Sequence, residues 1–203
     1  MTIENKLGIA DSPALAREEE RLSKRRAVEL FESGMLDALE PGTVESLFAI
    51  HRHLFQDVYD LAGVVRTVNI AKGGFRFAPV VYLEASLEAI ESMPQETFDE
   101  VIEKYVEMNA AHPFREGNGR SMRIWLDLML KRAIGQVVDW SLVDGEDYLL
   151  AMERSPIRDI EIKHVLRNAL TDKVDDRAVY MKGVDASYGY EGYTAFVAED
   201  LVS

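Results

Sequence analysis

The sequence predicts an all-α fold, a helical bundle that carries one small β-hairpin. Apolar residues recur at helical spacing along most of the chain. Gly, Pro and capping residues separate these periodic segments, and a strand-like pattern is confined to residues 67–77. With 203 residues and 47% hydrophobic side chains, the chain can bury the core of a single compact domain.

The helical segments can be assigned in order from their apolar spacing and their caps. Thr43 is placed to cap a helix in which Leu47, Ile50 and Leu54 share one face. Thr97 and Glu100 form a capping box, and Pro113 cannot continue the helix that they open. We expect helices at about 14–33, 43–55, 82–92, 97–110, from near 119 onward, 141–154, 158–170 and 184–196.

The single hairpin is predicted from two short runs around a glycine pair. Residues 67–70 and 75–77 are rich in β-branched and aromatic side chains, and Gly73 and Gly74 lie between them. A tight turn that contains glycine is typical of such a connection.

Composition excludes several classes of function. The chain has no cysteine, which excludes disulfides and thiolate zinc sites. Its net charge of −13 repels nucleic-acid phosphates, so nucleic-acid binding is not expected, although a nucleic-acid-processing enzyme could be a protein partner. We find neither an apolar run long enough to cross a membrane nor the pattern of a signal peptide, so we expect a cytoplasmic protein without membrane contact.

The stretch from His112 to Arg123 contains the residues that predict a catalytic and anion-binding site. Gly117-Asn118-Gly119 precedes a predicted helix, and two glycines there allow backbone N–H groups to approach an anion. Arg120 and Arg123 lie three residues apart on one face of that helix. Cations are disfavoured at a helix N-terminus, so this pair indicates a bound anion such as phosphate.

Two further side chains complete this predicted site. His112, with an ordinary pKa near ~6.5, can remove a proton at neutral pH. Glu116 can hold Mg²⁺ beside a phosphate, because this ion takes one or two carboxylates together with substrate oxygens. The set predicts attack of a hydroxyl on a magnesium-bound phosphoanhydride, and it leaves open which phosphorus is attacked.

The same stretch resembles the signature of the Fic family, H-x-F-x-(D/E)-G-N-G-R-x-x-R, at every defined position. The resemblance extends over about residues 43–170, through the segment from His51 to Gly63 and the segment Lys72-Gly73-Gly74-Phe75-Arg76-Phe77. It implies a Fic catalytic core at 43–170, an N-terminal helical extension at 1–42 and a C-terminal segment at 171–203.

The resemblance also implies an activity, the transfer of AMP from ATP to a Tyr, Thr or Ser hydroxyl of a target protein. His112 would then be the base and Glu116 the magnesium ligand. Gly117, Asn118 and Gly119 would form the anion hole, with Arg120 on the β-phosphate and Arg123 on the γ-phosphate. Lys72, Gly73, Gly74, Phe75, Arg76 and Phe77 would form a flap that docks the target.

A second motif lies near the C-terminus. Residues 187–192 match the family's inhibitory pattern, (S/T)-x-x-x-E-(G/N), in which Ser187 and Glu191 would share a helix face. The resemblance implies that Glu191 pairs with Arg123 in place of the γ-phosphate, and that relatives with this tail form homo-oligomers that regulate it. Tyr188, Tyr190 and Tyr193 are potential acceptors for self-modification, although packing of the helix is the favoured explanation for each of them.

Other functions remain open at this point. A related enzyme could transfer phosphate, UMP or phosphocholine, or could remove AMP from a modified protein. A non-catalytic interaction module is the remaining alternative, and the intact His112, Arg120 and Arg123 argue against it.

Overall fold

The computed structural model describes residues 3–72 and 75–201, and most of them are helical. The helices in this part of the chain are α1 (Ser12–Glu32), α2 (Val44–Phe55), α3 (Val80–Glu91), α4 (Phe98–Ala111), α5 (Asn118–Ile134), α6 (Gly145–Arg154), α7 (Ile160–Arg167) and α8 (Arg177–Gly189). Short 3-10 helices are η1 (Met35–Ala38), η2 (Trp140–Leu142) and η3 (Ala198–Leu201). The predicted all-α class is confirmed.

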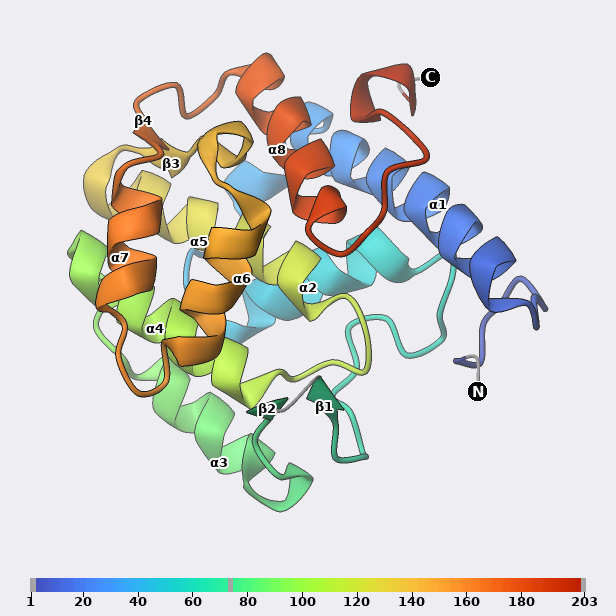
Figure 1. Ribbon diagram of the computed structural model, residues 1–203, viewed down its shortest axis with the longest axis horizontal. Helices are drawn as coiled ribbons and strands as arrows, with labels where there is room; N and C mark the ends of the chain where they lie inside the picture. The colour runs from blue at the N-terminus through green and yellow to red at the C-terminus, as the bar shows by residue number, and fades with distance from the viewer. Residues whose placement is uncertain (1–2, 73–74, 202–203) are drawn as a thin grey trace.

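Helix α5 forms the centre of the bundle, and it packs against α2, α4 and α8 (Figure 1). Its Trp125, Leu126 and Leu130 are fully buried in the hydrophobic core. Helix α1 lies across α2 and also contacts α8 and η3, so the C-terminal segment packs against the first helix of the chain. No helix in the described residues is long and apolar enough to span a bilayer.

The predicted helix starts at Thr43 and Thr97 are confirmed. The Thr43 side chain accepts a hydrogen bond from the N–H of Ser46, and Thr97 and Glu100 make both bonds of a capping box. Helix α4 ends at His112, which adopts the left-handed region with φ of 50° directly before Pro113. This conformation is uncommon for a non-glycine residue, and it turns the chain away from the helix axis.

The hairpin is confirmed, but its first strand begins later than predicted. Strand β1 (Ala71–Lys72) pairs antiparallel with β2 (Phe75–Arg76), while residues 67–70 are not a strand. Hydrogen bonds of polar side chains hold residues 67–70 in a non-strand conformation. Arg66 donates to the carbonyl of Val68, and the side chain of Asn69 accepts from the N–H of Val80 at the start of α3. Gly73 and Gly74, the predicted turn, lie outside the described residues.

A second strand pair forms where the sequence predicts none. Strand β3 (Val137–Val138) pairs antiparallel with β4 (Leu170–Thr171). The two strands are far apart in sequence, so no local pattern predicts their pairing. The predicted helices at 141–154 and 158–170 are correspondingly shorter, because Asp144 caps α6 and the strand β4 follows α7.

The last long helix begins and ends earlier than the predicted span of 184–196. Asp176 caps its start by accepting from the N–H of Val179, and α8 stops at Gly189. Gly192 then adopts a positive φ of 86°, which reverses the chain. Glu191 therefore lies in the turn after α8, and the prediction that Ser187 and Glu191 share a helix face is wrong.

Candidate active site

A cavity of about 660 Å³ opens between the end of α4, the start of α5 and the β1–β2 hairpin. The lining includes His112, Arg115, Glu116 and Gly117 of the loop after α4, together with Gly119 and Arg123 of α5. Lys72, Phe75 and Phe77 of the hairpin and Tyr148 and Met152 of α6 close the other sides. The predicted catalytic stretch and the predicted flap are therefore brought together around one cavity.

His112 presents one ring nitrogen to this cavity. Its Nδ1 lies 3.2 Å from the carbonyl oxygen of Asn109, a bond that requires Nδ1 to carry the proton. The ring stacks on Phe77 of the flap, with centroids 3.6 Å apart. Burial lowers the pKa of His112 to about 4, so the imidazole is neutral at physiological pH and its Nε2 can accept a proton.

The glycines of the stretch are required by close packing. Gly117 has a φ of 73°, and a Cβ there would lie 2.4 Å from the ring of Phe55. A Cβ at Gly119 would lie 2.5 Å from a carboxylate oxygen of Glu191. Because neither glycine carries a side chain, the backbone at the start of α5 is not covered. Its first N–H groups, which lack intrahelical acceptors, can therefore approach an anion.

Asn118 closes the loop with its side chain. Its Oδ1 accepts from the N–H of Phe114 and its Nδ2 donates to the carbonyl of the same residue, at 2.9 and 2.8 Å. Both polar atoms of the side chain are therefore engaged within the loop. Any contribution of Asn118 to an anion hole must come from its backbone.

Arg120 is fully buried among carboxylates and aromatic rings. Its guanidinium lies 2.7 Å from Glu19, 3.0 Å from Glu191 and 3.4 Å from Glu116. It also lies over the rings of Phe55, Tyr188 and Tyr193. Its Nη1 has no hydrogen-bond partner among the described residues, which leaves a buried donor at the site.

Arg123 is held by the C-terminal segment. Its Nε donates to the Ser187 hydroxyl at 2.6 Å, and its Nη2 donates to the Ser187 carbonyl at 2.8 Å and to Glu191 at 2.9 Å. The predicted pair of Arg123 with Glu191 is thus present. The same carboxylate also contacts Arg120, a contact that sequence reasoning did not predict.

The Glu191 carboxylate is an anion of the protein's own chain, placed between the two arginines. Burial alone would raise its pKa, but Arg120 and Arg123 outweigh burial and hold the pKa below its usual value. Glu191 is therefore ionised at neutral pH. The arrangement shows that this pair of arginines accommodates an anionic oxygen group at the start of α5.

Glu116 lies at the edge of the cavity and is partly exposed. Its Oε1 accepts from the N–H of Gly117 at 3.0 Å. In residues 3–72 and 75–201 no group of three or more acidic or imidazole side chains could hold a metal by itself. A single carboxylate beside a phosphate site fits the predicted mode of magnesium binding, in which water and phosphate oxygens supply most ligands.

Helix α1 contributes a side chain to the site that the sequence did not reveal. Glu19 is 3% exposed, and besides Arg120 it accepts from the hydroxyl groups of Tyr59 and Tyr193. Nothing in the local pattern separates Glu19 from the other acidic residues of α1. A buried carboxylate needs a partner, and the partner, Arg120, comes from a helix about 100 residues later in the chain.

Two more residues that hold the loop were also missed as functional residues. His51 is buried, its Nε2 lies 2.8 Å from the carbonyl of Glu116, and its ring stacks on Phe114. Arg66 donates to the carbonyls of His112, Val68, Ala78 and Ala111, which ties the end of α4 to the base of the flap.

The hydroxyl groups of Tyr190 and Tyr193 are engaged inside the protein. Tyr190 donates to the carbonyls of Trp140 and Val143, and Tyr193 donates to Glu19. The Tyr188 ring is 1% exposed, and burial raises its pKa to about 12. Modification of any of these phenols would require the segment after α8 to leave its position.

Comparisons with known proteins agree with this geometry. Residues 41–130 match the model of the Fic/DOC family. A probable protein adenylyltransferase of Sinorhizobium fredii is 34% identical over 75% of this chain and 82% of its own length. The probable protein adenylyltransferase Fic of Salmonella typhimurium is 29% identical over 83% of this chain and 87% of that protein.

Solved structures show the same fold at lower identity. A Bartonella tribocorum BepC protein with bound AMPPNP has a TM-score of 0.70 at 21% identity, covering 84% of this chain and 93% of that one. The Fic domain of a Bartonella quintana protein with bound ADP has a TM-score of 0.71 at 23% identity, with 84% and 91% covered. The matched signature, the similar relatives and the shared fold together establish that this chain belongs to the Fic/DOC family.

Proposed function

We propose that this protein is an autoinhibited protein adenylyltransferase, which transfers AMP from ATP to a hydroxyl group of a target protein. The observation that carries the proposal is the Glu191 carboxylate, seated between Arg120 and Arg123 at 3.0 and 2.9 Å. An anion already occupies the position that nucleotide phosphates would take. The adenylyltransferase names of the relatives from Sinorhizobium fredii and Salmonella typhimurium support the choice of AMP as the transferred group.

In the proposed reaction, His112 Nε2 takes the proton of the target hydroxyl. The hydroxyl oxygen forms a bond to the α-phosphorus, the bond to the β-phosphate bridging oxygen breaks, and pyrophosphate leaves. Arg120 and Arg123 hold the β- and γ-phosphates and stabilise the negative charge that the leaving group gains. The neutral imidazole matches its role as a base.

Glu116 would hold the magnesium ion of the ATP complex, which supplies charge neutralisation when it is bound. Phe75 and Phe77 of the hairpin line the cavity next to His112. The β1–β2 pair presents a short strand edge, on which a target segment can align through backbone hydrogen bonds. Lys72 and Arg76 belong to the same proposed docking flap.

Autoinhibition follows from competition for the two arginines. While Glu191 occupies them, the γ-phosphate cannot reach Arg123, and ATP is excluded from the pose needed for attack on the α-phosphorus. Truncating one member of a buried hydrogen-bonded charge pair typically costs about 2–5 kcal/mol. The proposed resting enzyme is therefore weakly active, and displacement of α8 together with the segment after it restores activity.

The test uses the full chain and ATP labelled separately at the α- or γ-phosphate. Glu191→Gly should raise α-label incorporation into protein strongly over the wild type, because the carboxylate that competes with the phosphates for both arginines is removed. Glu161→Gly, at an exposed carboxylate of α7, is the control and should not activate the enzyme. A variant that incorporates only γ-label would contradict AMP transfer, and one that gains no labelling would contradict autoinhibition.

The other reactions of this family are separated by the same experiment. Phosphate transfer would appear as γ-label alone, and removal of AMP would appear as loss of α-label from a premodified protein. UMP and phosphocholine transfer are tested with UTP labelled at the α-phosphate and with CDP-choline. A non-catalytic module would show none of these activities in the Glu191→Gly variant.

A further inference from the structure

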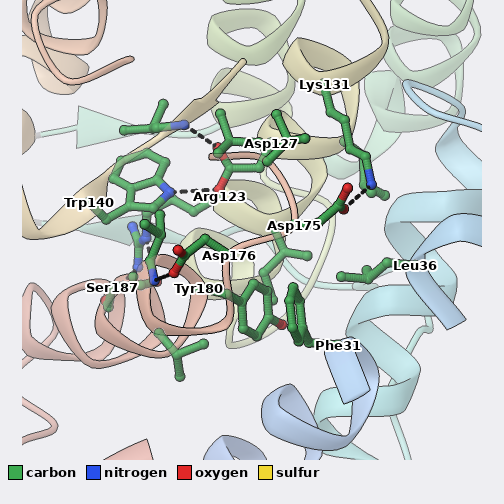
Figure 2. Close-up of a pocket in the computed structure, with 18 of the residues that line it drawn as sticks. Phe31, Leu36, Arg123, Asp127, Lys131, Trp140, Asp175, Asp176, Tyr180 and Ser187 are labelled. Atoms are coloured by element: carbon green, nitrogen blue, oxygen red, sulfur yellow. Dashed lines mark hydrogen bonds and ion pairs between the residues drawn. The ribbon is translucent and has the colours of Figure 1, made fainter. Parts of the chain in front are cut away.

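A second cavity, of about 270 Å³, lies between α5 and α8, and Arg120, Arg123 and Ser187 of the candidate active site are among its lining residues. Figure 2 shows Lys131 and Asp175 toward one side of it and Trp140, Arg123 and Ser187 toward the other. Its walls come from the end of α1, the segment with η1, α5, β3 and α8. The lining is mostly aliphatic and aromatic, with Phe31, Leu36, Ile124, Leu128, Trp140 and Tyr180 among its residues.

Most charged side chains around this second cavity already have partners. Arg120, which also lines it, is paired with Glu19 and Glu191, although its Nη1 has no hydrogen-bond partner among the described residues. Lys131 pairs with Asp37 and Asp175 at 3.1 and 2.6 Å. The two oxygens of Asp127 accept from the N–H of Val138 and from the indole N–H of Trp140. A charged ligand would therefore have to break one of these contacts, which selects for an uncharged molecule.

The size of this cavity limits the molecule that can fill it. A dry apolar cavity of about 150 Å³ binds benzene in a well-studied engineered protein. A volume near 270 Å³ leaves room for a larger, bicyclic ring system. The chemistry and the size together favour a neutral, mainly apolar ligand with one or two rings.

Helix α8 forms one wall of the cavity through Val179, Gly183, Val184 and Ser187. Ser187 is also the residue that holds Arg123, one turn before Glu191. When α8 leaves, this wall and the cavity are lost. A ligand in the cavity can thus bind only while α8 is in place.

We infer that this cavity is a regulatory site, at which a neutral one- or two-ring ligand holds α8 against α5 and keeps the enzyme inhibited. The inference rests on the proposed autoinhibition. The ligand is expected to inhibit, because a ligand that binds only one of two states shifts the equilibrium toward that state. At a ligand concentration ten times its Kd, the displaced state becomes about 11-fold less populated.

The test uses indole as the probe and the full-length protein. Indole should shift the methyl resonances of Ile124, Leu128 and Val184 and should slow amide hydrogen exchange along α8. Val184→Phe fills the cavity and should abolish these shifts, whereas Val81→Phe, at an exposed position of α3, should preserve them. Absence of shifts in the wild type would overturn the site.

The coupling has its own readout. At ten times its Kd, indole should lower the residual α-label incorporation of the wild type by about 11-fold. It should leave Glu191→Gly unaffected, since that variant is active with α8 in place. Binding without slower exchange in α8 would overturn the coupling, and this result does not depend on any activity. Equal inhibition of both proteins by indole would place the effect elsewhere and would also overturn it.

Discussion

Lys24 of α1 holds the C-terminal segment, for which we propose an inhibitory role, on both sides of Glu191, so replacing it should activate the enzyme. Its side chain is 1% exposed, and its Nζ lies 3.0 Å from Asp185 of α8 and 2.5 Å from the carbonyl of Phe196. The neighbouring Glu20 accepts from the N–H of Phe196 as well. We expect Lys24→Met to loosen this attachment while keeping the apolar stem of the side chain in place.

The size of the effect can be worked out from these contacts. The variant removes two charge-assisted contacts between α1 and the C-terminal segment, each worth about 1.5–3 kcal/mol. Met packing and the remaining bonds of Glu20 offset part of this loss, which leaves about 2–3 kcal/mol for the displacement equilibrium. Because about 1.4 kcal/mol is a factor of ten, incorporation of α-label should rise about 30- to 140-fold.

Lys104→Met separates this effect from a general loss of stability. Lys104 is also buried, and it bonds to Gln95 and to the carbonyls of Glu91 and Met93, far from the C-terminal segment. It should lower the free energy of unfolding without raising incorporation of label. If Lys24→Met labels no better than the wild type while Glu191→Gly is active, the proposed role of α1 is wrong.

Two further predictions concern titration. His112→Ala should abolish labelling by the Glu191→Gly variant. With His112 intact, that activity should persist down to about pH 5 and fall only as the pH approaches 4, because burial lowers the pKa of this base to about 4. A midpoint near 6.5 would contradict the assignment. Burial raises the pKa of Asp127 to about 7, so the folded state binds more protons than the unfolded state between about pH 4 and 7. Its contribution to stability therefore falls as the pH rises through that window, and Asp127→Asn should show a smaller loss between pH 5 and 8 in urea unfolding.

The local signals of the sequence predicted the frame of the site correctly. Thr43 and Thr97 cap their helices as expected, and Pro113 follows the end of α4. These features depend on contacts within four residues, which a sequence displays directly. The match from His112 to Arg123 predicted the order of the site residues for the same reason.

The errors concern the bounds of α8, where helical periodicity outweighed local cap and turn signals, and one pairing of distant segments. The start of α8 depends on the cap at Asp176, and its end depends on the turn at Gly192, so Glu191 lies in a turn that helical periodicity did not indicate. The pairing of β3 with β4 joins segments that are about 30 residues apart. Such pairings depend on tertiary packing and leave little trace in local propensity.

The sequence by itself determined which residues are the candidates for the base, the phosphate-binding helix start and the competing carboxylate, because these groups belong to two short motifs. Only the tertiary structure decided that Glu191 contacts both Arg120 and Arg123, and that Glu19 of α1 is the further counterion of Arg120. The physical reason is burial. A guanidinium removed from water must find its anions among whatever segments the fold brings to it, and these segments come from both ends of the chain.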